Sequence, residues 1–448
     1  MERVRPECLD FDHFVESTLG RSAMVPPVRA GTLVRVVGLT LEARGLTAPL
    51  GALCEIGGAL VGPPIEAEVV GFQGSTLFLM PFGDTAGISP GAVVRRVEAA
   101  RSAQVGPELL GRVIDGRGMP LDGKPLSLKH GQRLSPASHL NPMDRGPVSE
   151  ILDVGVRAIN GLLTIGRGQR VGLVAGSGVG KSVLLGMITR FAKADVVVIG
   201  LIGERGREVQ EFINESLGEE GLAKSVVIAA PANVSPLLRL KATHLAHSVA
   251  EYFRDQGLSV LLLVDSITRV AHAQREIGLA IGEPPTTKGY PPSVFGLLPS
   301  LIERAGPGVR GGGSITALYT VLAEGDDASD PIVDLVRASL DGQIMLSRSL
   351  ADAAHYPAID LSGSISRVMN RIVSPEFLHS ANRFRRLWTL YQQNRDLIQV
   401  GAYRSGTNAE LDDAIRLRLQ LEHYLRQGMN ESSDFQSSCR VIEDLMRS

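Results

Sequence analysis

The segment AGSGVGKS, residues 175–182, constrains the fold of this 448-residue chain more than any other stretch. It lies between an apolar run that predicts a strand, Arg170 to Ala175, and a stretch that predicts a helix, Ser182 to Ala192. A glycine-rich turn that joins a strand to a helix and ends in Lys-Ser is typical of a P-loop, which binds nucleotide phosphates. The sequence therefore predicts an α/β fold with a phosphate site at the end of a strand.

The residues of this loop have distinct expected roles. Its glycines allow a tight turn whose backbone N–H groups point at the β- and γ-phosphates. Lys181 would contact the same phosphates, and the hydroxyl of Ser182 would bind Mg²⁺. Ala175 stands where the usual pattern has its first glycine, and the spacing of the later glycines excludes a dinucleotide-binding loop. The predicted nucleotide-binding residues of the loop are Ala175, Gly176, Ser177, Gly178, Val179, Gly180, Lys181, Ser182 and Val183.

Two carboxylates follow other apolar runs of the same predicted sheet. The run SVLLLVD ends in Asp265, which we expect to hold the Mg²⁺ through its water shell because ligands bind at the carboxyl ends of parallel strands. The run VVVIGLIGE ends in Glu204, which we interpret as the base that activates the attacking water. A structural Glu204, held in a salt bridge by its charged neighbours, is an alternative that spacing alone leaves open.

Composition limits the classes of partner. The net charge of −2 argues against binding nucleic acid through bulk electrostatics, so we expect no nucleic acid partner. The longest apolar runs are too short to span a bilayer, and the N-terminal residues do not have the pattern of a signal peptide. Cys8, Cys54 and Cys439 lie far apart without metal-ligand spacing, which fits a reduced cytosolic protein.

Periodicity divides the chain into four expected parts. Apolar residues near period two, separated by glycine turns, predict a small β-barrel over residues 27–98. Residues 1–26 would be an arm that docks a partner or a helix that packs on the barrel. Apolar strands that alternate with helical stretches predict a parallel sheet covered on both faces over residues 99–372. Residues 373–448 are charged with helical spacing, which predicts a C-terminal helical domain.

Several motifs carry a resemblance to a known family, namely AGSGVGKS, GERGREV, LLLVDSITR, LAEGDDASDPI and HYPAIDLSGSISR. With these motifs the chain resembles the rotary-type hexameric ATPases, in which a small N-terminal β-barrel precedes a RecA-like P-loop ATPase core and a C-terminal helical domain follows it. The segments TLEARGLTAPLG, EVVGFQGSTLFLMPF and GEPPTTKGYPPSVFGLLPSLIERAG make it more similar to the flagellar type III protein export ATPases. The likeness covers nearly the whole chain, and it implies an ATPase with ATP, ADP and Mg²⁺ as ligands.

The resemblance implies roles for two residues in catalysis. Glu204 maps onto the catalytic glutamate of the GER motif, where non-catalytic paralogous subunits carry glutamine. Arg367, in SISR, maps onto an arginine finger that a neighbouring subunit inserts to stabilise charge in the transition state. The resemblance therefore implies a homohexamer with its sites at subunit interfaces.

Four more residues gain expected roles from the same resemblance. Arg205 and Arg269 map onto arginines close to the γ-phosphate, and Glu208 maps onto a carboxylate near the water shell of the metal. Tyr356, in HYPAID, maps onto the aromatic residue that stacks on adenine, although a packed tyrosine is the simpler interpretation of the residue itself.

The resemblance also implies a cellular process, a location and a set of partners. The protein would energise type III export for flagellum assembly, in the cytoplasm and peripherally at the inner-membrane export apparatus. The implied partners are a stator-like regulator at the N-terminal arm, a coiled-coil stalk protein in the pore, export chaperones with their substrates, and the membrane export gate.

Three other functions stay open on the sequence. The ATPase of a virulence injectisome would share the same chemistry. A hexameric RNA helicase of the transcription-terminator kind would need exposed aromatic residues on its barrel, whereas we expect Phe72, Phe78 and Phe82 in the barrel core. A nucleotide-binding structural subunit without activity would not need Glu204 and Arg367 together.

Overall fold

The computed structural model describes residues 29–57, 63–97, 103–128, 131–133, 140–322 and 330–447. The chain forms two compact units, residues 1–100 and 101–448. The expected N-terminal arm, residues 1–26, lies outside the described residues. Within the described ranges, no helix combines the length and the apolar character that a membrane crossing requires.

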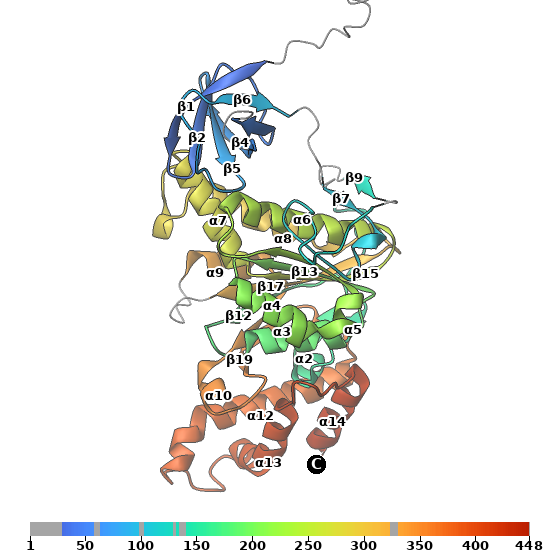
Figure 1. The fold of residues 1–448 in the computed structure, drawn as a ribbon. Coiled ribbons are helices and arrows are strands. Elements are labelled where there is room, and N and C mark those ends of the chain that lie inside the picture. The colour runs from blue at the N-terminus through green and yellow to red at the C-terminus, as the bar shows by residue number, and fades with distance from the viewer. Residues whose placement is uncertain are drawn as a thin grey trace, which may run out of the picture. The chain divides into compact units, whose positions relative to one another are not determined.

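The first unit contains a closed barrel of six short strands, as the period-two pattern predicts (Figure 1). Side chains alternate between its interior and its surface; in β3, for example, Cys54 and Ile56 are buried. The barrel order is β1-β2-β5-β4-β3-β6. The strands are β1 (Ala30–Val37), β2 (Thr40–Arg44), β3 (Leu53–Ile56), β4 (Ile65–Gln73), β5 (Thr76–Pro81) and β6 (Val93–Arg96).

The expectation that all three barrel phenylalanines lie in the core is wrong for Phe72, which is 61% exposed. Phe72 lies near the end of β4, two residues before the glycine at position 74 that begins the hairpin turn to β5, and side chains at a hairpin tip extend past the buried layer. Phe78 is half-buried between the core residues Leu77 and Leu79 of β5, so it lies on the opposite face of the strand and is not in the barrel core either. Phe82, which directly follows β5, is buried but does not belong to the barrel core.

The second unit is built on a nine-stranded sheet in the order β19-β18-β12-β17-β15-β13-β14-β8, with β16 beside β17. The neighbouring strands are parallel except for β19 and β16, which run antiparallel to β18 and β17. The strands are β8 (Arg112–Ile114), β12 (Arg170–Ala175), β13 (Val196–Ile202), β14 (Ser225–Ala230), β15 (Ser259–Asp265), β16 (Gly306–Pro307), β17 (Ser314–Leu322), β18 (Gly342–Leu346) and β19 (Ile359–Ser366). Two small pairs, β7 (Gln104–Val105) with β9 (Gln132–Arg133) and β10 (Ile151–Leu152) with β11 (Ile165–Gly166), lie outside this sheet.

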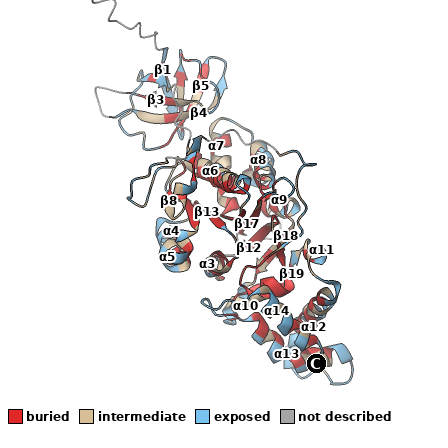
Figure 2. Cartoon of the chain, turned by 90° about the vertical axis from the view of Figure 1, so that its right-hand side faces the viewer, coloured by how far each residue is buried: buried red, intermediate tan, exposed pale blue. Residues whose placement is uncertain are grey.

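Helices cover both faces of the sheet (Figures 1 and 2), which explains why its strands are continuous apolar runs. In β15, Leu261 and Leu263 face the side of α3, whereas the alternate residues Val260, Leu262 and Val264 face the side of α6, α7, α8 and α9. The helices of this part are α2 (Arg157–Leu162), α3 (Lys181–Phe191), α4 (Gly206–Glu211), α5 (Gly218–Ala223), α6 (Pro236–Asp255), α7 (Ile267–Ala280), α8 (Pro292–Glu303), α9 (Pro331–Ser339), α10 (Arg348–Asp352) and α11 (Met369–Ile372).

The C-terminal residues form the expected helices, α12 (Pro375–Gln399), α13 (Ala409–Leu425) and α14 (Phe435–Arg447). Ser374 and Asn408 begin α12 and α13, because their side chains accept hydrogen bonds from the first free backbone N–H groups. Arg385 of α12 donates hydrogen bonds to the carbonyl oxygens of Leu361 (2.9 Å) and Ser364 (2.7 Å) in β19. The helical part is therefore tied to the edge strand of the sheet.

Candidate nucleotide site

The P-loop segment lies where the sequence predicts it, between the carboxyl end of β12 and the start of α3. Gly178 and Gly180 adopt left-handed φ angles of 76° and 89°, which a residue with a side chain rarely adopts. The first turn of α3 contains no acidic residue. The positive end of its helix dipole is therefore free to attract an anion.

Behind the loop, Lys181 lies between the carboxylate of Asp265, the last residue of β15, and that of Glu204, which follows β13. Its Nζ is 2.5 Å from Oδ1 of Asp265 and 3.4 Å from Oε1 of Glu204. Asp265 is buried, with 4% exposure, and also accepts a 2.6 Å hydrogen bond from the hydroxyl of Thr320 in β17. Three neighbouring strands thus bring these groups together at the carboxyl edge of the sheet, as open α/β sheets do with ligand-binding residues.

Burial and charge shift the pKa values of this cluster. Burial and the nearby Asp265 carboxylate raise the pKa of Glu204 to about 7, against the opposing effect of Lys181. Burial lowers the pKa of Lys181, but the Asp265 and Glu204 carboxylates outweigh that effect and raise it overall. Lys181 is therefore firmly cationic near neutral pH, and Glu204 can both hold and release a proton there.

An open cavity of about 800 Å³ lies beside the loop. Its lining contains most of the residues predicted from the sequence, namely Ala175, Gly176, Ser177, Gly178, Gly180, Lys181, Ser182, Val183, Glu204, Arg205, Glu208 and Arg269. Val179 does not line it, because its side chain is buried. Asp265 lies beneath the cavity floor, where it contacts Lys181. Gly203, whose φ is 73°, has no side chain, and a methyl group there would lie 2.7 Å from Cβ of Arg269.

Tyr356 lies over the P-loop. A methyl group placed on Gly180 would make a tight contact of 3.3 Å with a ring carbon of Tyr356, so the ring lies directly against this glycine. The tyrosine is 45% exposed, and its carbonyl oxygen accepts a 3.0 Å hydrogen bond from the backbone N–H of Gln427 after α13. Its ring therefore offers an accessible aromatic face next to the phosphate loop.

Arg367 does not line this cavity. It lines a separate cleft with residues of α9 and β18. Because Arg367 directly follows β19, which runs antiparallel to β18, it lies at the amino edge of the parallel strands, opposite the P-loop. The structure thus brings together all the predicted site residues except Arg367.

Several residues of the site escape prediction from the sequence, among them Arg239, Arg348 and Thr320. Arg239, in the first turn of α6, lines the cavity and is 8% exposed, and Arg348 donates a 3.0 Å hydrogen bond to the carbonyl oxygen of Ser177. Thr320 holds Asp265 from the middle of an apolar strand, where a single hydroxyl is the only signal. Within the described residues, Nε of Arg239 and Nε of Arg269 are buried without a hydrogen-bond partner. The guanidinium of Arg239 pairs with Glu276 through a terminal nitrogen at 2.9 Å, so its Nε is a spare donor rather than part of an unpaired charge. Buried spare donors of this kind fit a cavity that receives an anion.

Family models match three parts of the chain. The nucleotide-binding domain of the ATP synthase alpha/beta family matches residues 155–366, and the β-barrel domain of that family matches residues 33–98. The T3SS EscN ATPase C-terminal domain matches residues 373–444.

Curated relatives match over nearly the full length. A "Flagellum-specific ATP synthase" of Pseudomonas aeruginosa is 57% identical, with 94% of each chain covered. The protein of the same name from Salmonella typhimurium is 55% identical over 94% of this chain and 95% of that protein. A "Type 3 secretion system ATPase" of Xanthomonas euvesicatoria is 46% identical over 96% of this chain and 97% of that protein.

Solved structures agree with these matches. The assembled ATPase EscN of the enteropathogenic E. coli type III secretion system superimposes with a TM-score of 0.87 at 42% identity, covering 93% of this chain and 100% of that chain. EscN in complex with its central stalk EscO gives a TM-score of 0.84 at 41% identity, with the same coverage. The resemblance predicted from the motifs is confirmed by all three comparisons.

Proposed function

Because this chain belongs to the ATP synthase alpha/beta family, among its flagellar and type III secretion ATPases, and is an ATPase, we propose that it drives type III protein export during flagellum assembly as a homohexamer. The observation that carries the proposal is the cluster of Lys181, Asp265 and Glu204 behind a P-loop, in a chain that is 57% identical to a flagellar relative. The flagellar assignment is favoured over an injectisome because the flagellar relative of Pseudomonas aeruginosa is 57% identical to this chain, whereas the type III secretion relative is 46% identical.

The oxygen donors next to the P-loop fit Mg²⁺. The Ser182 hydroxyl lines the cavity and the Asp265 carboxylate lies beneath it, and hydroxyl and carboxylate oxygens are the ligands that Mg²⁺ prefers. We propose that Ser182 and Asp265 hold the ion together with the nucleotide, Asp265 through water. The bound ion would neutralise charge on the phosphates.

Side chains of the protein carry out the other steps of hydrolysis. Glu204 orients a water molecule and accepts its proton as the water attacks the γ-phosphate, which releases ADP and phosphate. A pKa near 7 suits this role, because the carboxylate is ionised in a useful fraction and still accepts a proton. Lys181 contacts the phosphates as a cation whose own pKa is raised.

The remaining cavity residues bind the nucleotide in this proposal. Arg205 and Arg269 contact the γ-phosphate, and Glu208 lies near the water shell of the metal. The ring of Tyr356, which is accessible beside Gly180, stacks on the adenine. A neighbouring subunit supplies Arg367, which cannot reach the P-loop of its own chain.

The proposed partners extend what the relatives' structures contain. EscN assembles and binds a central stalk, EscO, and we propose that this chain likewise forms a homohexamer around a coiled-coil stalk protein. We propose further that a stator-like regulator binds residues 1–26, and that chaperones with their substrates bind the hexamer. The export gate would then hold the protein peripherally at the cytoplasmic face of the inner membrane.

The experiment that tests this function is specific ATPase activity against protein concentration, with and without RNA. Activity should rise cooperatively with concentration, Glu204→Gln and Arg367→Ala should each lose at least about a hundredfold in rate, and RNA should have no effect. Activity that is independent of concentration and survives Arg367→Ala would contradict the shared site. Stimulation by RNA would support the helicase instead.

A further inference from the structure

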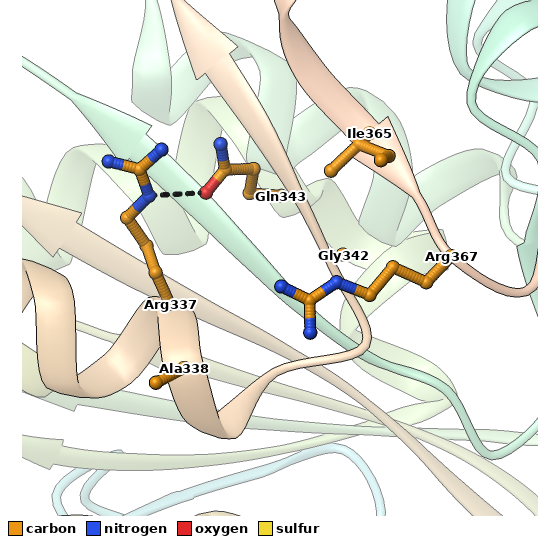
Figure 3. Close-up of a pocket in the computed structure, with 6 residues that line it drawn as sticks. All are labelled: Arg337, Ala338, Gly342, Gln343, Ile365 and Arg367. Carbon is orange, nitrogen blue, oxygen red and sulfur yellow. Dashed lines mark hydrogen bonds between the residues drawn. The ribbon is translucent and has the colours of Figure 1, made fainter.

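The cleft that contains Arg367 contains a second arginine, Arg337 (Figure 3). The cleft has a volume of about 290 Å³ and is formed where α9 ends, β18 begins and β19 ends. Its lining residues are Arg337, Ala338, Gly342, Gln343, Ile365 and Arg367. Nothing in the sequence motifs singles out Arg337, which lies in the last turn of α9.

The cleft cannot serve the P-loop of its own chain. Gly342, which lines the cleft, begins β18 and pairs with Val171 at the start of β12, whereas the P-loop follows the last residue of β12. A strand of six residues separates the two edges by roughly 20 Å at the usual rise per residue. Any group that the cleft receives from a catalytic site therefore comes from another copy of the chain.

Hydrogen bonds hold Arg337 in a fixed orientation. Its Nε donates to Oε1 of Gln343 at 2.7 Å, and the Nε2 of the same glutamine donates to the carbonyl oxygen of Gly363 at 2.8 Å. In Figure 3 only Nε of Arg337 is joined to Gln343, and neither terminal nitrogen of the guanidinium is bonded to a residue drawn there. The glutamine thus uses one nitrogen of the guanidinium and leaves the paired terminal nitrogens for another acceptor.

The charge in the cleft is not balanced within the described part of the chain. One terminal nitrogen of Arg367 donates to the carbonyl oxygen of Leu340 at 3.2 Å, and neither arginine forms an ion pair with a described carboxylate. Two guanidinium groups that line one small cleft repel each other, so an anion bound beside them would stabilise the arrangement. Ile365, on the edge strand, also lines the cleft and is 48% exposed.

We propose that Arg337 is a second anion-binding residue of the subunit interface, where it and Arg367 together receive an oxyanion presented by a neighbouring copy of this chain. This inference rests on the proposed homohexamer. The oxyanion has two sources with the same chemistry, the phosphates of the neighbour's nucleotide or a carboxylate on the neighbour's surface. Gln343 is a positioning residue, because it acts only by orienting Arg337.

The test compares Arg337→Gln, Arg337→Lys and the wild type, with Arg440→Ala as the matched control. Arg440 is an exposed arginine of α14, far along the chain from the cleft. Two quantities are measured for each protein. Sedimentation velocity with a non-hydrolysable ATP analogue gives the hexamer fraction, and ATPase rates against protein concentration give kcat at saturation and the concentration for half-maximal activity.

The two sources predict different losses for Arg337→Gln. If the neighbour's phosphates bind Arg337, kcat falls about tenfold or more while the hexamer fraction stays that of the wild type. If a carboxylate binds it, the half-maximal concentration rises about tenfold or more and kcat at saturation is kept. Arg337→Lys should recover part of either loss, because it keeps the charge but not the two paired donors.

The inference is overturned if both Arg337 variants match Arg440→Ala within about twofold in assembly and in kcat, a change too small for a lost charge-assisted hydrogen bond. A folding defect in Arg337→Gln would be visible in its thermal unfolding, and Arg337→Lys then provides the comparison. The proposed function fails separately, through a wild type whose activity is independent of concentration and an active Arg367→Ala.

Discussion

The ammonium group of Lys181 lies 2.5 Å from the carboxylate of Asp265, and both side chains are almost fully enclosed, at 13% and 6% exposure. Each residue has a different expected partner when nucleotide is bound, the phosphates for Lys181 and the metal for Asp265. Without nucleotide the two charges neutralise each other. The contact therefore keeps a charged site folded until phosphate and metal replace it.

Removal of Lys181 should destabilise the nucleotide-free protein as well as abolish its activity. Lys181→Ala leaves Asp265 charged and buried, so we expect a loss of about 3–5 kcal/mol in the free energy of unfolding. The control is Lys193→Ala, whose ammonium is 2.9 Å from Asp153 but whose side chain is 65% exposed, and we expect less than about 1 kcal/mol there. Urea denaturation at neutral pH measures both. Equal losses in the two variants would contradict the account.

The rate should depend on pH through Glu204. The pKa of this group is raised to about 7, and the base must be ionised to act. We therefore expect kcat/KM to rise with pH through about 7 and, near pH 6, to be about tenfold lower than its value at mildly alkaline pH. Initial rates from acid to mildly alkaline pH, at low ATP, measure the profile of the free enzyme. A profile that is flat across neutrality would rule out Glu204 as the base.

Tyr356 should contribute to nucleotide affinity through its ring. Tyr356→Ala should weaken ATP binding about tenfold or more, because stacking of a base on an aromatic ring is worth about 1–3 kcal/mol. Tyr356→Phe keeps the ring and should bind ATP nearly as the wild type does. Titration of a fluorescent ATP analogue measures both affinities. A phenylalanine variant as weak as the alanine variant would assign the effect to the hydroxyl instead.

His247 should make stability fall in acid. Its imidazole is 1% exposed, contacts the carbonyl oxygen of Thr243 at 2.8 Å and the hydroxyl of Tyr319 at 3.0 Å, and burial lowers its pKa to about 3. Below about pH 6.5 the imidazole of His247 binds a proton in the unfolded chain but stays neutral in the folded chain. The free energy of unfolding is therefore highest above that pH and decreases as the pH falls. The expected loss is about 2 kcal/mol between pH 6.5 and pH 5.

The control for this prediction is His247→Gln, which does not titrate. Its free energy of unfolding should decrease less steeply with falling pH than that of the wild type. The difference between the two slopes should correspond to about one bound proton. Urea denaturation at several pH values compares the two proteins. Parallel slopes would mean that the folded protein protonates His247 as readily as the unfolded chain does.

Much of the fold follows from local patterns. The apolar runs that end in Asp265 and Glu204 predict buried strands, because only strands covered on both faces are apolar throughout. Glycines at positions 178 and 180 predict the left-handed turn of the P-loop. Phe72 shows the limit of such patterns, because strand periodicity does not tell where a hairpin leaves the barrel core.

The rest of the site depends on tertiary placement. Arg239 and Thr320 carry no local signal of function, since a lone arginine in a helix or a lone threonine in a strand is common. They join the site because α6 begins and β17 ends at the same edge of the sheet as the P-loop. Arg337 likewise carries no local signal of function. It lies beside Arg367 because the order of the strands in the sheet brings α9 and β19 together.

The central claim is that each catalytic site is shared between two copies of the chain, and mixing two inactive variants tests it most directly. Glu204→Gln lacks the base but keeps Arg367, whereas Arg367→Ala keeps the base. In an equal mixture, about a quarter of the interfaces join an intact base to an intact arginine, so activity should recover to roughly that fraction of the wild type. A mixture that stays as inactive as its two components would contradict the shared site.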